Sequence, residues 1–169
     1  SGVNLIQFFG HSDPSQLDIE ILTAQEYNNV GRYFFMIVNG CYSGDFADSP
    51  RGRTLGENFI IADSMGAIGY LSNASVGFLG IMKDMTRRFY ELAFHDSLGM
   101  PVGKALQRVN QDAIRDQVPV FWRRNHLREV HLQGDPALSL YKPRKTDLKF
   151  AVSECKMNPN PIQLSDSIV

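Results

Sequence analysis

The chain has 169 residues and a formal net charge of −1, from 17 basic and 18 acidic side chains. This length suits one domain with the start of another, and a hydrophobic content of 43% is that of a globular chain with a core. The nearly balanced charge argues against a nucleic acid or an anionic membrane as partner. No apolar run approaches the ~20 residues that a transmembrane helix needs.

The cysteine content excludes a disulfide scaffold. Only Cys41 and Cys155 are present, and neither has a second metal ligand at zinc-finger or zinc-ribbon spacing. No signal peptide is recognisable, and the chain opens with Ser1-Gly2 directly before an apolar run. We interpret this start as the remnant of an expression tag or an internal cut, rather than a natural start.

Apolar runs and capping motifs define the first half of the chain. Residues 3–9, 34–38 and 66–72 predict three buried strands, the first two ending at or just before glycine. Alternating apolar residues at 15–22 predict a short strand or an extended lid. Capping boxes at Thr23 and Thr54 predict one helix that ends near Gly31 and another that runs to about Ser64.

The second half is mainly helical. A long helix is expected from Val76 to about Phe94, with Asn73 or Ser75 as its cap. Its apolar positions recur at the spacing of one helix face, which we interpret as core rather than as a cofactor site. They are Met82, Met85, Phe89 and Leu92. A further helix follows from Pro101 to about Asp116.

The segment 119–141 is less regular. Residues 119–130 fit no element clearly, and we interpret Trp122 and its neighbouring arginines as a solvated face rather than a nucleic-acid surface. A last strand is predicted at 137–141. Together, strands that alternate with capped helices predict an α/β domain with a mainly parallel sheet.

A change of composition marks a boundary near residue 142. We therefore assign residues 1–142 to the main domain and 143–169 to a linker and the beginning of a β-module. The module is indicated by alternating apolar residues, typical of a half-exposed antiparallel strand. These are Leu148, Phe150 and Val152.

Cys41 stands where chemistry collects in open α/β sheets, just past the carboxyl end of a buried strand. Three known motifs around a nucleophile each require particular residues at fixed positions, so they can be compared with the residues around Cys41. A phosphatase loop would place arginine at position 47, an α/β-hydrolase elbow would place glycine at 39 and 43, and a redox pair would place cysteine at 44. These positions hold Ala47, Asn39, Ser43 and Gly44. Covalent catalysis by a cysteine and a histidine remains.

His11 is the best partner for Cys41 among the four histidines. It follows the first strand as Cys41 follows the second, so both side chains could share one crevice. His95 lies near a helix C-terminus, where a cationic ring is favourable without any function, and His126 and His131 are expected to have ordinary surface or packing roles. Spacing alone leaves both a catalytic dyad and a structural pair open.

The two strand-end motifs, Phe9-Gly10-His11-Ser12 and Asn39-Gly40-Cys41-Tyr42-Ser43-Gly44-Asp45-Phe46, resemble the gingipain family of cysteine peptidases within the caspase-like clan. The resemblance continues through 55–57, 66–72 and 132–137 and spans about 3–141. It implies a caspase-like three-layer α/β/α sandwich. It also implies that Cys41 is the nucleophile, that His11 is the general base, and that the backbone N–H groups of Ser12 and Cys41 hold the oxyanion.

The resemblance further implies an endopeptidase that acts on polypeptides through an acyl-enzyme, without a cofactor. Such proteins are secreted or lie at the bacterial cell surface or outer membrane, often after type IX secretion. Residues 1–142 are expected to be the C-terminal portion of the caspase-like peptidase domain, whose upstream strands this chain lacks. Upstream and downstream domains of the same protein, the latter beginning as an immunoglobulin-like module, are the expected partners. The family often binds structural calcium, but no Asp-rich loop of EF-hand type occurs in this sequence.

Position 12 departs from the family, which usually has glycine after the histidine, whereas this chain has Ser12. A serine side chain restricts φ and is expected to crowd the substrate site. The alternative interpretation is therefore a catalytically inactive pseudopeptidase that serves as a binding or scaffolding module.

Overall fold

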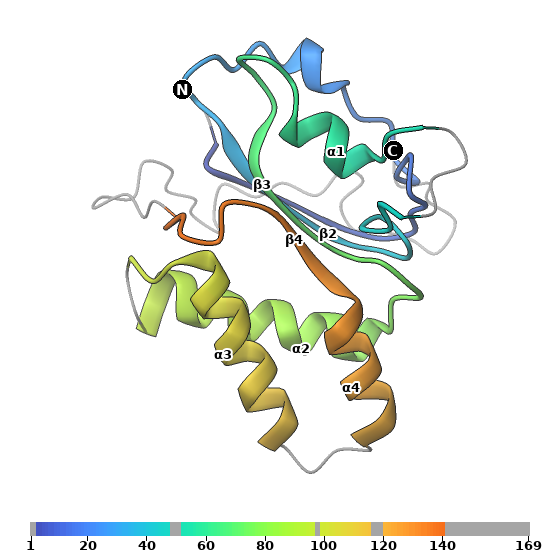
Figure 1. The fold of residues 1–169 in the computed structure, drawn as a ribbon, viewed down its shortest axis with the longest axis vertical. Coiled ribbons are helices and arrows are strands. Elements are labelled where there is room, and N and C mark those ends of the chain that lie inside the picture. The colour runs from blue at the N-terminus through green and yellow to red at the C-terminus, as the bar shows by residue number, and fades with distance from the viewer. Residues whose placement is uncertain (1–2, 48–51, 97–98, 116–119, 141–169) are drawn as a thin grey trace, which may run out of the picture.

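A four-stranded sheet forms the centre of the computed structural model, which describes residues 3–47, 52–96, 99–115 and 120–140 (Figure 1). Its order is β1-β2-β3-β4. The strands are β1 (Leu5–Phe9), β2 (Phe34–Asn39), β3 (Ala67–Asn73) and β4 (Val130–Gly134). The first three are parallel and β4 runs antiparallel to β3, which confirms the mainly parallel sheet.

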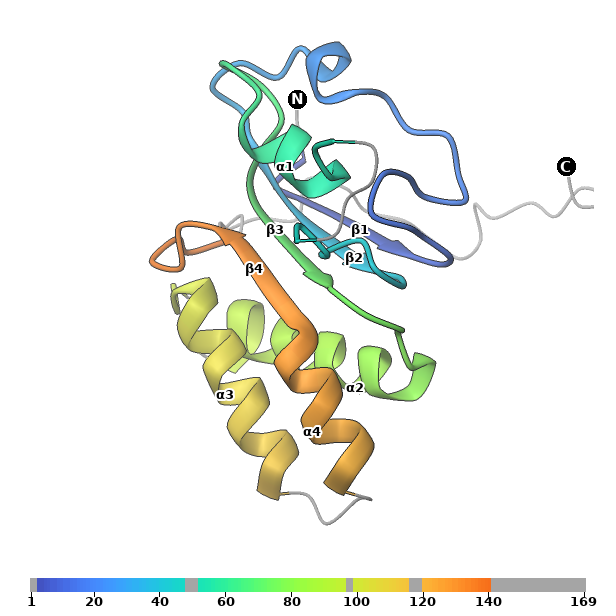
Figure 2. The same ribbon diagram turned by 45° about the vertical axis from the view of Figure 1, so that its right-hand side comes forward.

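Helices cover both faces of this sheet and make three layers (Figure 2). One face carries α1 (Leu55–Ile60) and the short 3₁₀ helix η1 (Ala24–Tyr27), while α2 (Leu79–Tyr90), α3 (Val102–Arg115) and α4 (Val120–Glu129) lie on the other. A π-helical segment, η2 (Glu91–Asp96), continues α2. The α/β/α sandwich implied by the family resemblance is confirmed.

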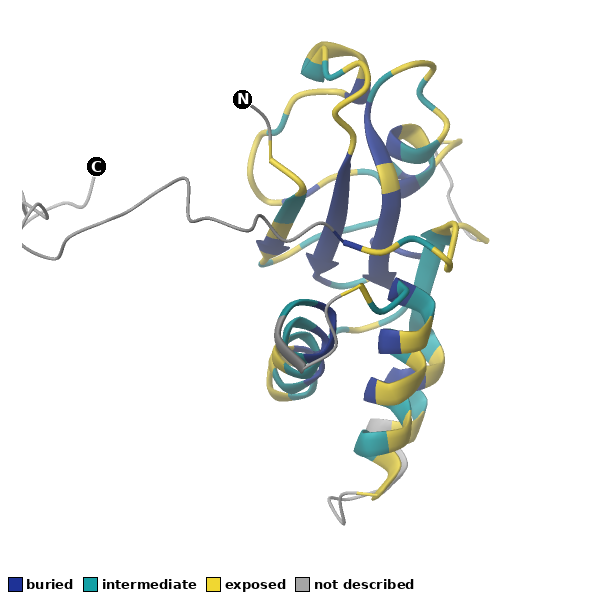
Figure 3. Ribbon diagram, turned by 90° about the vertical axis from the view of Figure 1, so that its left-hand side faces the viewer, coloured by how far each residue is buried: buried dark blue, intermediate teal, exposed yellow. Residues whose placement is uncertain are grey.

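Strand β2 is the centre of the core, since all six of its residues are buried (Figure 3). Successive side chains on a strand point to opposite faces. Phe35 and Ile37 accordingly join the cluster formed with α2 and α3, while Phe34 and Met36 join the cluster formed with α1. This two-sided burial explains the continuous apolar run in the sequence.

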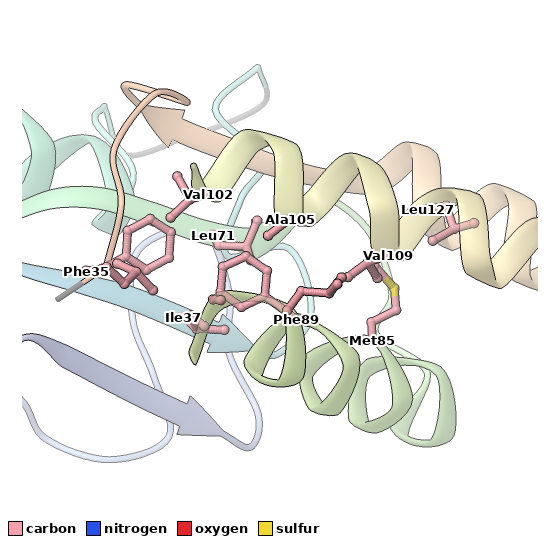
Figure 4. Packing of buried hydrophobic residues seen from close by; sticks show 12 residues of the cluster. Phe35, Ile37, Leu71, Met85, Phe89, Val102, Ala105, Val109 and Leu127 are labelled. Carbon is pink, nitrogen blue, oxygen red and sulfur yellow. The ribbon is translucent and has the colours of Figure 1, made fainter. Parts of the chain in front are cut away.

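The apolar stripe of α2 and η2 is core, as predicted: Met82, Met85, Phe89 and Leu92 are all buried. In the close view of this cluster, Phe89 lies against β2 (Figure 4). Its ring stacks on that of Phe35, with centroids 6.2 Å apart and planes 16° apart.

The predicted capping boxes are present, but the helices they open are short. The Glu57 N–H donates to Thr54 Oγ1 at 3.2 Å, and the Thr54 N–H donates to Glu57 Oε2 at 2.7 Å. Helix α1 nevertheless ends at Ile60, and the chain then turns through left-handed Ser64 and Gly66, with φ of 60° and 85°. At Thr23 the box opens only η1, which ends at Tyr27 instead of near Gly31.

Helix α2 begins later than predicted. Its cap is Phe78, without a side-chain hydrogen bond, so the expected caps Asn73 and Ser75 are wrong. Asn73 belongs to β3, and its side-chain amide donates to the Ser75 carbonyl at 2.7 Å. The five residues from Ala74 to Phe78 therefore form a loop at the carboxyl edge of the sheet.

The predicted last strand is also wrong. Between 137 and 140 only an isolated bridge forms, from Ser139 to Pro101, and the fourth strand is β4 instead. Residues 15–22 contain one isolated bridge, at Leu17, and no strand. The domain boundary at 142 and the predicted β-module at 143–169 lie outside the described residues, and so does the candidate linker.

Candidate active site

The ends of β1 and β2 bring the two sequence motifs to one edge of the sheet. Phe9 pairs with Asn39, and the Gly10 N–H donates to the Asn39 carbonyl at 3.1 Å. Both strands are parallel and in register, so His11 and Cys41 each follow two residues after a paired position. The two residues therefore leave the sheet from adjacent strand ends.

A side-chain hydrogen bond joins the two loops directly. The Ser12 hydroxyl donates to the Cys41 carbonyl at 2.7 Å. This approach requires glycine at position 40, where an added Cβ would lie 2.0 Å from Ser12 Oγ and 2.8 Å from Ser12 Cβ. The Ser12 side chain is thus directed at the backbone of the Cys41 loop.

Two backbone donors are free at this edge. Ser12 pairs with Leu17 in an isolated antiparallel bridge, whose hydrogen bonds are made by the residues on either side. The N–H of Ser12 therefore makes no hydrogen bond within the described residues, and neither does that of Cys41. Both residues are partly buried, and backbone N–H groups without a protein partner can bind a developing oxyanion.

The loop after β3 supports Cys41 from the other side. The thiol is free and partly buried, and the Gly77 N–H donates to its Sγ at 3.4 Å. The next residue, Tyr42, adopts a left-handed φ of 57°, and its N–H donates to the Ser75 carbonyl at 2.9 Å. A non-glycine residue held in this conformation is typical of functional loops.

The remainder of the Cys41 loop is anchored to β3 and β4. The Gly44 N–H donates to the Asn73 carbonyl at 2.9 Å, and Ser43 is fully buried. His131 lies beside the loop, with Nδ1 3.4 Å from the Gly44 carbonyl and its ring 5.3 Å from that of Phe46. His131 thus has the packing role expected from the sequence.

His11 is exposed, and its backbone is fixed by Asp18. The His11 N–H donates to Asp18 Oδ2 at 3.3 Å, and the Asp18 N–H donates back to the His11 carbonyl at 2.9 Å. The imidazole ring makes no hydrogen bond within the described part of the chain. Nothing in the sequence pattern singles out Asp18, because its role depends on the turn at Ser12.

The described side chains and helices bear on two further kinds of site, a metal-binding cluster and a membrane-spanning helix. No group of three or more His, Cys, Asp or Glu side chains is placed to hold a metal ion there. None of the described helices combines the length and apolar character needed to cross a bilayer.

Comparisons with known proteins bear on the family and the fold of this chain. A family model for peptidase family C25 matches residues 1–141. A solved protease structure is similar at a TM-score of 0.68 and 17% identity, covering 83% of this chain and 36% of that one. The Arg-specific cysteine proteinase gingipain R is similar at a TM-score of 0.69 and 15% identity, and the match covers 82% of this chain and 34% of that one. This chain thus spans about a third of each structure, and no curated protein matches.

Proposed function

Because the chain belongs to peptidase family C25, we propose that it carries the catalytic dyad of a cysteine endopeptidase, with Cys41 as nucleophile and His11 as general base. The observation that carries the proposal is the pairing of the two strand ends, in register and joined by the hydrogen bond from Ser12 to Cys41. The solved structures are similar to this chain in fold only, so the catalytic activity is a proposal.

The proposed reaction proceeds in two stages. His11 takes the thiol proton as Cys41 Sγ attacks the scissile carbonyl carbon, and the carbonyl electron pair moves to oxygen. The tetrahedral oxyanion is held by the N–H groups of Ser12 and Cys41, whose individual loss typically costs about 10²–10³ in rate. Collapse expels the amine, protonated by His11, and leaves an acyl-enzyme. His11 then deprotonates water, which hydrolyses the thioester and frees Cys41.

We also propose the larger protein and the cellular location in which this activity occurs. The chain covers about a third of the two solved structures, so we place it within a larger secreted or cell-surface bacterial protein, with further domains on both sides. Type IX secretion is proposed from the family resemblance alone. The dyad chemistry needs no cofactor, and its substrates are polypeptides.

An inactive binding module is the competing function. Ser12 in place of the usual glycine favours it, as does a His11 ring that no described residue orients. The direction of the Ser12 hydroxyl weighs against it, since this group tightens the contact between the loops.

The test uses the longer natural protein that contains these residues, incubated with a peptide library. Turnover is expected in the wild type, is abolished by Cys41→Ala and falls to background with His11→Ala. Cys155→Ser is the matched control and keeps activity. Iodoacetamide should label Cys41 in preference to Cys155, and this preference should depend on His11. A folded wild type without turnover or selective labelling would establish the inactive module instead.

A further inference from the structure

A small cavity lies behind the carboxyl ends of β2 and β3, on the side covered by α2, α3 and α4. Its volume is about 30 Å³. Much of its wall is apolar, but five of the lining residues carry polar side chains. These are Asn39, Ser72, Asn73, Thr86 and His126.

The polar groups around this cavity are buried, and most have no partner. Asn39 Nδ2 and Asn73 Oδ1 make no hydrogen bond. His126 is only 1% exposed. Its ring lies close to the backbone of Val76, but neither ring nitrogen makes a hydrogen bond of good geometry. Buried polar groups in native proteins are nearly always paired, so a cluster of this kind indicates a bound polar molecule.

The two asparagines present complementary groups. Asn39 Oδ1 accepts from the Thr86 hydroxyl at 3.0 Å, which leaves Asn39 Nδ2 as a donor. Asn73 Nδ2 donates to the Ser75 carbonyl at 2.7 Å, which leaves Asn73 Oδ1 as an acceptor. A neutral imidazole offers one donor and one acceptor, whereas the Ser72 hydroxyl lies on the other face of β3, beside Gly44.

Water matches both the size and the chemistry. One water needs at least about 10–15 Å³ of accessible cavity and two to four polar partners, and a cavity of about 30 Å³ has that room. We propose that internal water fills this cavity and links His126 to Asn39 and Asn73, which makes His126 a positioning residue for the Cys41 loop.

The linked residues hold this loop at both ends. Asn39 directly precedes Gly40 and Cys41. The Asn73 carbonyl accepts from the Gly44 N–H at 2.9 Å, and its side chain fixes the Ser75 carbonyl that accepts from the Tyr42 N–H. Helix α4 thus reaches the loop through His126 and the bound water. The ring itself is packed edge-on against Phe78, with centroids 6.2 Å apart.

The cavity favours a neutral imidazole. The described residues that line it come from β2, β3, β4, α2, α3 and α4, and none is Asp, Glu, Lys or Arg. A protonated His126 would therefore have no counter-ion among them. Burial also lowers the pKa of His126.

Hydrogen exchange of backbone amides tests the positioning role without any need for turnover. In the full-length protein, His126→Leu should speed exchange of the Tyr42 and Gly44 amides about tenfold, the effect of losing roughly one hydrogen bond. His126→Gln keeps a donor and an acceptor and should stay close to the wild type. The Ile37 amide of β2 is the internal control. Unchanged exchange at Tyr42 and Gly44 in a folded His126→Leu protein would overturn the proposal.

A crystal structure of the wild type at high resolution tests the water directly, so the proposal stays testable if His126→Leu fails to fold. Ordered water within hydrogen-bonding distance of His126 and at least one asparagine is expected, and a dry cavity would refute it. The consequence for catalysis rests on the proposed function: kcat should fall in His126→Leu with KM little changed. Loss of loop protection without any turnover in the wild type would disprove the peptidase and leave the positioning role standing.

Discussion

The contact between Ser12 and Gly40 is the most sensitive point of the candidate site, and Gly40→Ala probes it. The new Cβ would lie 2.0 Å from Ser12 Oγ, 2.8 Å from Ser12 Cβ and 3.0 Å from the Gly10 carbonyl oxygen. No side chain fits there without movement, so Ser12 must swing away and release the Cys41 carbonyl.

The expected cost follows from these two effects. Overpacking a close contact typically costs about 1–3 kcal/mol, and loss of a hydrogen bond adds about 0.5–1.5 kcal/mol. We therefore expect Gly40→Ala to lower the free energy of unfolding by about 2–4 kcal/mol, measured by equilibrium denaturation in urea. If the proposed peptidase is active, displacing the N–H of Ser12 should also slow it about 10²–10³-fold.

A double-mutant cycle identifies the cause. Ser12→Gly removes both clashing side-chain atoms, so Ser12→Gly with Gly40→Ala should be more stable than Gly40→Ala alone, with a coupling of about 1–3 kcal/mol. Gly80→Ala is the matched control: its Cβ would meet nothing within 4 Å, and it should stabilise α2 by up to about 1 kcal/mol. A coupling near zero would refute the steric argument.

Three further changes test the scaffold and the buried histidine. Thr54→Ala should cost about 0.5–2 kcal/mol by removing the cap of α1, while Thr54→Ser should retain most of it in thermal unfolding; equal losses would contradict the capping role. Phe35 is fully buried, so Phe35→Ala should cost about 3–5 kcal/mol, against less than about 0.5 kcal/mol for Leu22→Ala at an exposed site. Because burial lowers the pKa of His126 below 6.5, the unfolded state binds the extra proton first, and stability should fall as pH drops below that value. His126→Gln should flatten this acid limb; an unchanged slope would show that other groups cause it.

The strands that carry the site were predictable because each is buried on both faces or ends at glycine. In β2 all six residues are buried, which leaves an apolar run that no surface element would tolerate. The carboxyl ends of parallel strands share one edge, which is why the sequence predicts that His11 and Cys41 follow neighbouring strand ends. The cap at Thr54 was predictable for a similar reason, since its hydrogen bonds are local.

Strand β4 was not predictable from its own residues. Among the described strands it pairs with β3 alone, its residues are half-buried or exposed, and it carries polar His131 and Gln133. The apolar alternation at 137–141 gave the stronger local signal. These apolar residues pack against the domain without forming the hydrogen-bond ladder of a strand. The Leu138 carbonyl accepts from the Val102 N–H at 2.7 Å, and Leu140 is buried.

The groups that support the nucleophile were hidden for a different reason, which is their distance along the chain. Gly77 reaches Cys41 Sγ from the loop after β3, and His126 lies behind the same loop from α4. In the sequence, His126 and His131 are five positions apart, which is not the spacing of neighbours on one helix face. In the fold they belong to different elements, α4 and β4, and have different surroundings. The positions of the candidate reacting groups can therefore be predicted from the strand ends. The residues that contact their loops are fixed by tertiary packing and cannot. Ser12 illustrates both: its position was predictable, but the direction of its hydroxyl depends on the absence of a side chain at Gly40.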